Sequence, residues 1–291
     1  MSGTRTVRLR YGRSTIELAV PAAAELLEPR EPALRLDRDS FRAGLAAELP
    51  EPLPSGRIVI VVADKTRLCG YPTVLPWLVE LLAERGAGPE RITFFFFFWV
   101  HARQSEAESL AAYGPVCTRY RFVHHDCDDA AAFVDLGRTG RGTPGRVRRG
   151  LVEADLVLTV GAISHHYFAG FGGGRKLLFP GLGERRAILA NHRLFLDPAT
   201  RTLHPHCCAG RLAGNPLAED LDEIARLLPR PLSVHGLLDS SGALVACRIG
   251  RGPEAFTRAC REHECCFRAP GDRRYRLVVA SAGGYPKDIN L

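Results

Sequence analysis

Side chains that could bind an anion and move a proton follow several apolar segments of this 291-residue chain. Asp64-Lys-Thr-Arg67 follows the first long apolar run, His101 follows the second, and His165 and His166 follow the third. If these runs are parallel strands, their carboxyl ends meet at one edge of a sheet, where α/β proteins bind their ligands. Carboxylate, guanidinium and imidazole groups gathered there could grip a substrate carboxylate and transfer protons near neutral pH.

The segment 64–67 alone is compatible with two interpretations. Arg67 could hold a carboxylate through two parallel hydrogen bonds, while Asp64 could accept a hydroxyl group or orient a cation beside the Thr66 hydroxyl. The same residues would also suit an ordinary strand-end turn with a surface ion pair.

The stretch His166-Tyr-Phe-Ala-Gly-Phe-Gly-Gly-Gly-Arg-Lys176 is the most informative part of the chain. Its four glycines, three of them at Gly172, Gly173 and Gly174, would let the backbone approach an anion closely. Neither a Walker A loop nor a G-x-G-x-x-G motif is present. The apolar residues on both sides favour an ordered loop that carries two cations, Arg175 and Lys176.

A cluster of histidine and cysteine residues at 204–208 and 260–266 offers a competing site. It could hold a structural zinc ion, but neither segment has a C-x-x-C knuckle, and buried thiols with exposed histidines are the alternative. The nine cysteines are odd in number and scattered along the chain, which is typical of thiols in a reducing compartment.

The order of apolar patterns predicts an α/β fold with a mainly parallel sheet flanked by helices. Continuous apolar runs predict buried parallel strands at 57–64, 92–100 and 155–160, and alternation at 6–21 predicts a β-hairpin with one buried face. The further expected elements are helices at 76–85, 105–113, 184–190, 217–228 and 253–263, strands at 120–124, 232–238, 243–249 and 276–280, and a polar stretch at 137–150.

Composition excludes several classes of protein. With 46% hydrophobic and 24% charged residues the chain is not disordered, and its net charge of +7 comes from arginines spread along the whole length, so we expect no nucleic-acid partner. No apolar run approaches the roughly 18 residues of a membrane helix, and the N-terminus lacks an apolar signal segment. We therefore expect no membrane partner and a cytoplasmic location.

Six motifs in the same order as in a known family cover the chain from its first predicted strand to its end. They are DKTR at 64–67, the His101 turn, HYFAGFGGGRKLLFPG at 166–181, NH at 191–192, GNPL at 214–217 and GGYPKDINL at 283–291. In these motifs the sequence resembles the LarA-like lactate racemase family, whose members depend on a nickel-pincer nucleotide.

The resemblance implies a cofactor and the residues that hold it. The cofactor is a pyridinium-3,5-bisthiocarboxylate mononucleotide that carries nickel, and in the family a thioamide tethers it to a lysine, which by position is Lys176. His192 would complete the nickel coordination, a reasonable partner for soft sulfur donors. Asp64 and Thr66 would lie near the cofactor, and Gly172, Gly173 and Gly174 against its nucleotide portion.

The resemblance also implies a reaction. A racemase or epimerase of this family takes hydride from the hydroxyl-bearing carbon of a 2-hydroxy acid and returns it to the opposite face. His101 and His166 would alternate as base and acid on the hydroxyl group. Arg67 would hold the carboxylate, and Lys287 would be a second cation.

The sequence departs from the family pattern in three places. Leu68 replaces the usual proline after Thr-Arg, and the run 94–99 is aromatic where small residues are usual. The third departure is that members of the family continue through a complete second α/β domain after the GGYPKD motif, whereas this sequence stops at Leu291. We therefore expect a cofactor-binding α/β domain at 1–270 and the start of a second α/β domain at 271–291, whose remainder is missing or supplied by another polypeptide. The expected partners are therefore a small 2-hydroxy acid, cofactor-biosynthesis proteins and such a polypeptide.

Two alternatives to a complete racemase remain open at this point. One is a noncatalytic protein that binds or stores the nickel-pincer nucleotide, or an inactive fragment, and the other is a zinc-stabilised α/β module that uses the 204–208 and 260–266 cluster.

Overall fold

The computed structural model describes residues 3–97, 104–269, 273–285 and 288. The chain divides into two compact units, one of Met1–Arg30 with Phe267–Leu291 and one of Glu31–Cys266. The larger unit carries the sheet and most of the predicted site. The domain boundary expected after residue 270 stays a prediction.

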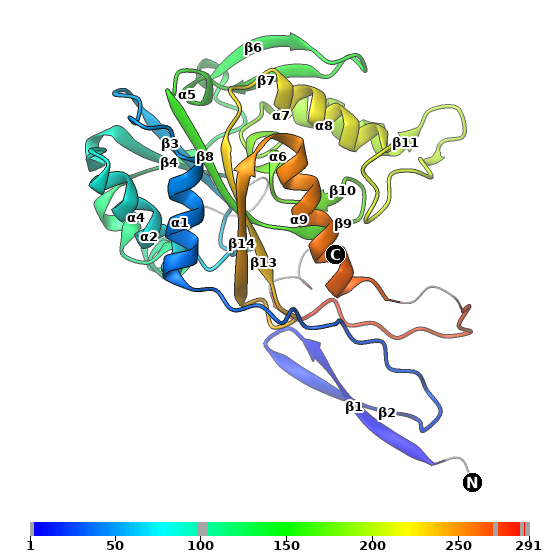
Figure 1. Ribbon diagram of the computed structural model, residues 1–291. Helices are drawn as coiled ribbons and strands as arrows, with labels where there is room; N and C mark the ends of the chain where they lie inside the picture. The colour runs from blue at the N-terminus through cyan, green and yellow to red at the C-terminus, as the bar shows by residue number, and fades with distance from the viewer. Residues whose placement is uncertain (1–2, 98–103, 270–272, 286–287, 289–291) are drawn as a thin grey trace. The chain divides into compact units, whose positions relative to one another are not determined.

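A six-stranded sheet forms the centre of the larger unit (Figure 1), in the order β14-β13-β8-β3-β4-β5. Five strands run parallel and β14 is antiparallel to its neighbour β13. The strands are β3 (Ile58–Val62), β4 (Ile92–Phe97), β5 (Arg121–His125), β8 (Leu156–Ala162), β13 (Leu232–Leu238) and β14 (Leu244–Arg251). The predicted α/β class with a mainly parallel sheet is confirmed.

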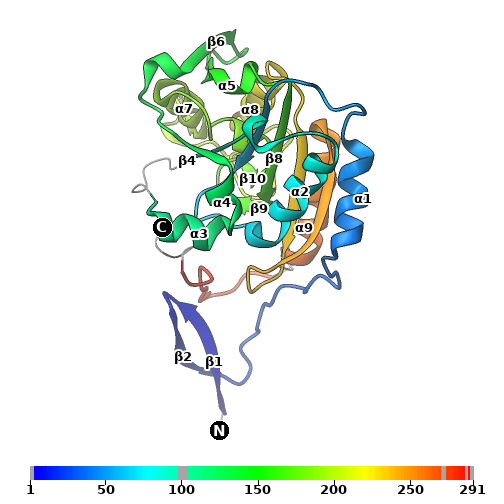
Figure 2. The same cartoon turned by 90° about the vertical axis from the view of Figure 1, so that its left-hand side faces the viewer.

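Helices cover both faces of this sheet, which explains why its strands are continuous apolar runs. All five residues of β3 are buried, and so are Phe94, Phe95 and Phe96 in β4. Helices α1 (Arg38–Glu48), α2 (Tyr71–Glu84), α3 (Glu106–Tyr113) and α4 (Val116–Arg119) lie on one side, which faces the viewer in Figure 2. Helices α6 (Arg175–Leu178), α7 (Arg185–His192), α8 (Pro216–Arg226) and α9 (Gly252–Phe267) lie on the other side (Figure 1).

Two predicted segments differ in extent from the structure. Helix α2 begins at Tyr71, five residues before the expected start, because Pro72 and not Pro76 occupies the first turn that suits proline. The stretch 137–150, expected only as a polar stretch, contains part of a hairpin of β6 (Phe133–Arg138) and β7 (Pro144–Arg148). The remaining elements are α5 (Arg149–Val152), β9 (Ser164–His166), β10 (Gly170–Gly172), β11 (Leu196–Asp197), β12 (Thr202–Leu203) and the 3-10 turns η1 (Pro89–Arg91), η2 (Ala130–Ala132) and η3 (Arg193–Phe195).

The smaller unit contains the predicted hairpin, β1 (Thr4–Tyr11) paired with β2 (Ser14–Pro21). Alternate side chains of the hairpin are at most half-buried, so the expected buried face is incomplete. The predicted strand at 276–280 is wrong: the segment pairs with no described strand, and Leu277 is 80% exposed. An apolar run becomes a strand only where a neighbour completes its hydrogen bonds. In the part of the chain that the structure describes, no helix has the length and apolar character to cross a membrane.

Candidate functional site

Two buried tyrosines fix the chain where β3 ends. The backbone N–H of Ala63 donates to the Tyr71 hydroxyl (2.8 Å), which donates to the carbonyl of Val160 at the end of β8 (3.1 Å). From the other side the Tyr113 hydroxyl donates to the Ala63 carbonyl (3.0 Å). Burial raises the pKa of both tyrosines, so both remain hydrogen-bond donors at neutral pH.

Asp64 follows directly and is fully buried. Its Oδ1 accepts hydrogen bonds from the Thr66 backbone N–H (2.8 Å) and the Thr66 hydroxyl (2.5 Å). Its Oδ2 lies 4.0 Å from Nη1 of the half-exposed Arg67 and has no hydrogen-bond partner among the described residues. A buried carboxylate oxygen without a donor requires an explanation, and a ligand that donates a hydrogen bond would provide one.

Sequence reasoning missed Gln104, Ser105 and Glu108, which hold this loop against α3. The Gln104 side-chain oxygen accepts from the Lys65 backbone N–H (3.0 Å) and lies 3.3 Å from the Tyr113 hydroxyl. Glu108 pairs with the Lys65 ammonium group and also forms a capping box with Ser105 at the start of α3. The S-x-x-E spacing at 105–108 was the available sequence signal for this cap.

The glycine-rich stretch is ordered, as expected, and brings His166 to Lys176. Strands β9 and β10 form a short antiparallel hairpin in which Gly170 pairs with His166. The backbone N–H groups of Phe168 and Ala169 donate to Nδ1 of His166 at 3.3 and 3.1 Å. Nε2 of His166 lies 2.9 Å from Nζ of Lys176.

These contacts fix the protonation of the pair. Because Nδ1 of His166 accepts hydrogen bonds, the ring proton resides on Nε2, which donates to the lone pair of a neutral Lys176 amine. Burial, then Arg175 and Arg67, lowers the pKa of Lys176 to about 7. Burial, then Lys176, lowers the pKa of His166 to about 2. The site therefore contains a neutral imidazole beside a lysine that is substantially uncharged at neutral pH.

The three glycines at 172–174 are explained by packing within the chain. A Cβ atom on Gly173 would lie 2.4 Å from the Ala162 carbonyl oxygen, and one on Gly174 would lie 2.4 Å from the Phe256 ring. Both glycines have a positive φ, and a Cβ on Gly172 would meet the Ser164 hydroxyl at 3.0 Å. Their expected contact with a nucleotide stays a prediction.

Arg175 does not present its guanidinium to the site as the sequence interpretation assumed, although its charge still lowers the pKa of Lys176. Its guanidinium is buried, pairs with Asp222 (2.5 Å) and lies 4.7 Å from the centre of the Phe256 ring. Arg175 therefore anchors α6 to α8 and α9, and the cation that points toward His166 is its neighbour Lys176.

His192 ends α7, and one of its ring nitrogens is hydrogen-bonded to the backbone of the same helix. Its Nδ1 donates to the Ile188 carbonyl (2.8 Å), so Nε2 carries the lone pair that a metal ion would use. Burial, then Lys176, lowers the pKa of His192 to about 4, which keeps the ring neutral.

Two buried asparagines from the NH and GNPL motifs position this region. The amide of Asn191 donates to Asp220 (2.8 Å), whose other oxygen accepts from the Thr139 hydroxyl (2.5 Å). Asn215 caps α8 and donates to the carbonyl of Phe168 beside His166 (2.8 Å). These asparagines support the site without presenting chemistry of their own.

The structure thus gathers most of the predicted site in one place. Lys176 lies 2.9 Å from His166, and the charges of Lys176, His192 and Arg67 all lower the pKa of His166, so these four residues lie close together. Arg67 in turn lies next to Asp64 and Thr66. His165 faces elsewhere, stacked on Phe171 at 5.2 Å between ring centres. The predicted residues His101 and Lys287 lie outside the described residues.

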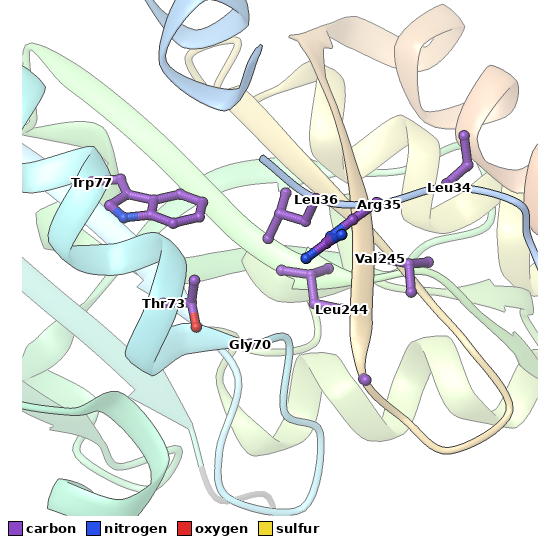
Figure 3. Close-up of a pocket in the computed structure, with 9 residues that line it drawn as sticks. Leu34, Arg35, Leu36, Gly70, Thr73, Trp77, Leu244 and Val245 are labelled. Atoms are coloured by element: carbon purple, nitrogen blue, oxygen red, sulfur yellow. The ribbon is translucent and has the colours of Figure 1, made fainter. Parts of the chain in front are cut away.

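The cysteine and histidine cluster does not assemble a metal site. Among the residues that the structure describes, three potential ligands come close together only at Asp126, Cys127 and Asp128, which belong to neither 204–208 nor 260–266. A cavity of about 380 Å³ lies elsewhere, lined by Trp77, Leu244 and other mostly apolar residues, with Arg35 at its wall (Figure 3). None of the predicted site residues lines it.

The fold and the site define an α/β protein with an uncharged lysine–histidine pair, a buried carboxylate and an arginine beyond the carboxyl ends of parallel strands. The chain belongs to the family of the lactate racemase N-terminal domain, which matches residues 11–203. The resemblance inferred from the motifs is confirmed.

Two lactate racemases are similar to the chain in sequence. That of Thermoanaerobacterium thermosaccharolyticum is 26% identical over 307 residues, which cover 98% of this chain and 68% of that protein. That of Lactiplantibacillus plantarum is 28% identical over 238 residues, covering 80% of this chain and 54% of that protein.

Solved structures share the fold. The lactate racemase apoprotein of T. thermosaccharolyticum superposes with a TM-score of 0.84 at 24% identity, over 97% of this chain and 67% of that one. A protein of Thermotoga maritima superposes with a TM-score of 0.61 at 19% identity, over 81% of this chain and 59% of that one.

Proposed function

We propose that this chain acts in the racemisation or epimerisation of a lactate-like 2-hydroxy acid, with a nickel-pincer nucleotide attached covalently to Lys176. Family membership supports a lactate racemase-type isomerase. The observation that carries the cofactor assignment is the pairing of Lys176 Nζ with His166 Nε2 at 2.9 Å, because it keeps a lysine amine uncharged and nucleophilic.

The residues present fit such a cofactor. Lys176 offers the free amine that a thioamide link requires, and His192 offers a neutral imidazole whose Nε2 can bind nickel beside sulfur donors. The unpartnered Oδ2 of Asp64 can accept a hydroxyl group, such as one of the nucleotide portion. When bound, the cofactor would supply a reversible hydride acceptor.

The chain's own residues would bind and orient the substrate. Arg67 is half-exposed and has no carboxylate closer than 4.0 Å among the described residues, so its guanidinium can donate two parallel hydrogen bonds to a substrate carboxylate. Lys65 and Gln104 hold the loop that carries Arg67. His101 and Lys287 stay proposed as the second acid–base residue and the second cation.

His166 would become a better proton acceptor once Lys176 is acylated. Besides burial, the charged form of Lys176, which is still present at neutral pH, is the largest cause of the low pKa of His166. A thioamide at Nζ carries no positive charge, so attachment would raise the His166 pKa toward the range that general acid–base catalysis needs.

The chain spans about two thirds of the length of the first relative named above. The activity of a whole racemase is therefore proposed here as one that a further polypeptide segment completes. The expected partners are that segment, the cofactor-biosynthesis proteins and a small 2-hydroxy acid.

Co-expression with cofactor-biosynthesis proteins tests the proposal. We expect nickel and one covalent adduct on Lys176 in the wild type, no adduct in Lys176→Ala, and an adduct with reduced nickel content in His192→Ala. Conversion of a single lactate enantiomer into the racemic mixture then measures turnover. An adduct that persists in Lys176→Ala would refute the attachment site, and loading without turnover after the proposed further segment is supplied would support a storage protein instead.

A further inference from the structure

Lysine is rare in this chain, and its positions are informative. The sequence contains 36 arginines and three lysines, at positions 65, 176 and 287. Arginine keeps its proton under all ordinary conditions, whereas a lysine amine can lose its proton and attack a carbon atom. Chemistry that requires a free amine is therefore confined to three places and the N-terminus.

The two described lysines have opposite partners. Lys65 pairs with the carboxylate of Glu108. Lys176 instead faces the imidazole of His166, whose Nδ1 is already engaged by two backbone N–H groups. That arrangement favours the uncharged, reactive form of the Lys176 amine.

A carboxylate-binding group accompanies this amine. Arg67 influences the electrostatics of both Lys176 and His166, so its guanidinium shares their site. A small molecule that places a carboxylate on Arg67 would present its neighbouring carbon toward the same site. A carbonyl group at that carbon is an electrophile suited to a lysine amine.

We propose that Lys176 of the cofactor-free chain condenses reversibly with 2-oxo acids to form an imine. The Nζ lone pair attacks the carbonyl carbon, a carbon–nitrogen bond forms, and both amine hydrogens leave with the carbonyl oxygen as water. No oxidant or reductant is consumed. The Nε2–H of His166, 2.9 Å from Nζ, would donate a hydrogen bond to the imine nitrogen.

This activity goes beyond the proposed function, because it uses the same lysine but requires neither the cofactor nor turnover. It would make a 2-oxo acid a competitor of cofactor attachment, since both need the free Nζ atom. Failure to form an imine would leave the racemase proposal intact, and failure of cofactor loading would not affect the imine proposal.

Reductive trapping tests the imine directly. The 291-residue chain, purified without cofactor, is incubated at neutral pH with pyruvate and cyanoborohydride, and its intact mass and peptides are measured. We expect one adduct per chain, located on the peptide that contains Lys176. Peptide mapping of the wild type gives the location even if a variant fails to fold. Adducts spread over the three lysines, or no adduct beyond that of the denatured chain, would overturn the proposal.

Matched variants and ligands test the two contacts. Lys176→Arg keeps a positive charge at this position but offers no reactive amine, so it should lose the adduct. Pyruvate should label the wild type at least about tenfold faster than acetone, which has the carbonyl group but no carboxylate, and Arg67→Gln should remove most of this preference. Equal labelling by pyruvate and acetone would overturn the assignment to 2-oxo acids.

Discussion

The reactivity of the Lys176 amine should change steeply around neutral pH. Burial is the main cause that lowers its pKa to about 7, followed by the charges of Arg175 and Arg67. At pH 7 about half of the Lys176 amines are then uncharged, against about one in 2500 for a lysine with the ordinary pKa of about 10.4. The uncharged, reactive fraction of Lys176 should therefore be roughly a thousandfold larger at pH 7 than that of a free lysine side chain.

Trace labelling with acetic anhydride between pH 5 and pH 10 measures this difference. The peptide that contains Lys176 is quantified by mass spectrometry against Nα-acetyl-lysine, whose side-chain amine is free, as the reference amine in the same tube. The labelling rate should rise with a midpoint near pH 7, because the uncharged amine is the reactive form. Arg67→Gln removes one nearby positive charge and should move the midpoint to higher pH.

The same shift has a consequence for stability, and its sign is defined. The folded-state pKa of Lys176 lies below the unfolded value, so between about pH 7 and about pH 10.4 the unfolded chain binds more protons. The contribution of this lysine to the free energy of unfolding should rise with pH across that window. A labelling midpoint above about pH 9 would refute both statements, because it would mean that His166 faces an ammonium group.

Two further predictions concern the packing that supports the site. Gly174→Ala should lower the free energy of unfolding, measured in urea, by about 2–4 kcal/mol, because Gly174 has a φ of 51° and the new Cβ would meet the Phe256 ring. The control Gly242→Ala, at a positive φ with open space around it, should lower it by only about 1 kcal/mol, and similar losses in the two variants would contradict the packing argument. Asp220→Ala should cost about 2–4 kcal/mol, because it leaves the buried Asn191 amide and Thr139 hydroxyl without their acceptor, while Glu223→Ala at a surface ion pair should cost under about 1 kcal/mol. Equal effects of these two carboxylates would show that the buried network contributes little.

Local patterns were sufficient to predict the parallel strands. A strand covered on both faces is mostly apolar, and the runs that became β3, β4 and β8 have that property apart from Thr93 and Thr159. The run that includes Leu277 has the same pattern but remains exposed, since a strand also needs a hydrogen-bonded neighbour that no local pattern reveals. An apolar run therefore predicts a strand correctly only where the fold also supplies a neighbouring strand, which the sequence around Leu277 could not reveal.

The residues that position the site were harder to predict than those with obvious chemistry. Asp64, His166, Lys176 and His192 carry groups whose chemistry can be read from residue type. Gln104 acts through one side-chain oxygen that meets Lys65 across a separation of 39 residues, and no spacing rule connects the two. Such contacts arise from the crossover that places α3 beside the end of β3, so they require the tertiary fold.

The assignment of Arg175 shows how local geometry could have corrected the sequence interpretation. Adjacent residues on a helix point about 100° apart, so a helix that begins at Arg175 cannot direct both Arg175 and Lys176 into one site. One of the two cations had to face the core, where a buried guanidinium requires a carboxylate partner. Arg175 has that partner in Asp222 on α8, while Lys176 faces a neutral imidazole. Because arginine can fill the first role but cannot lose the proton that the second role requires, the order Arg-Lys and not Lys-Arg is what the site demands at these two positions.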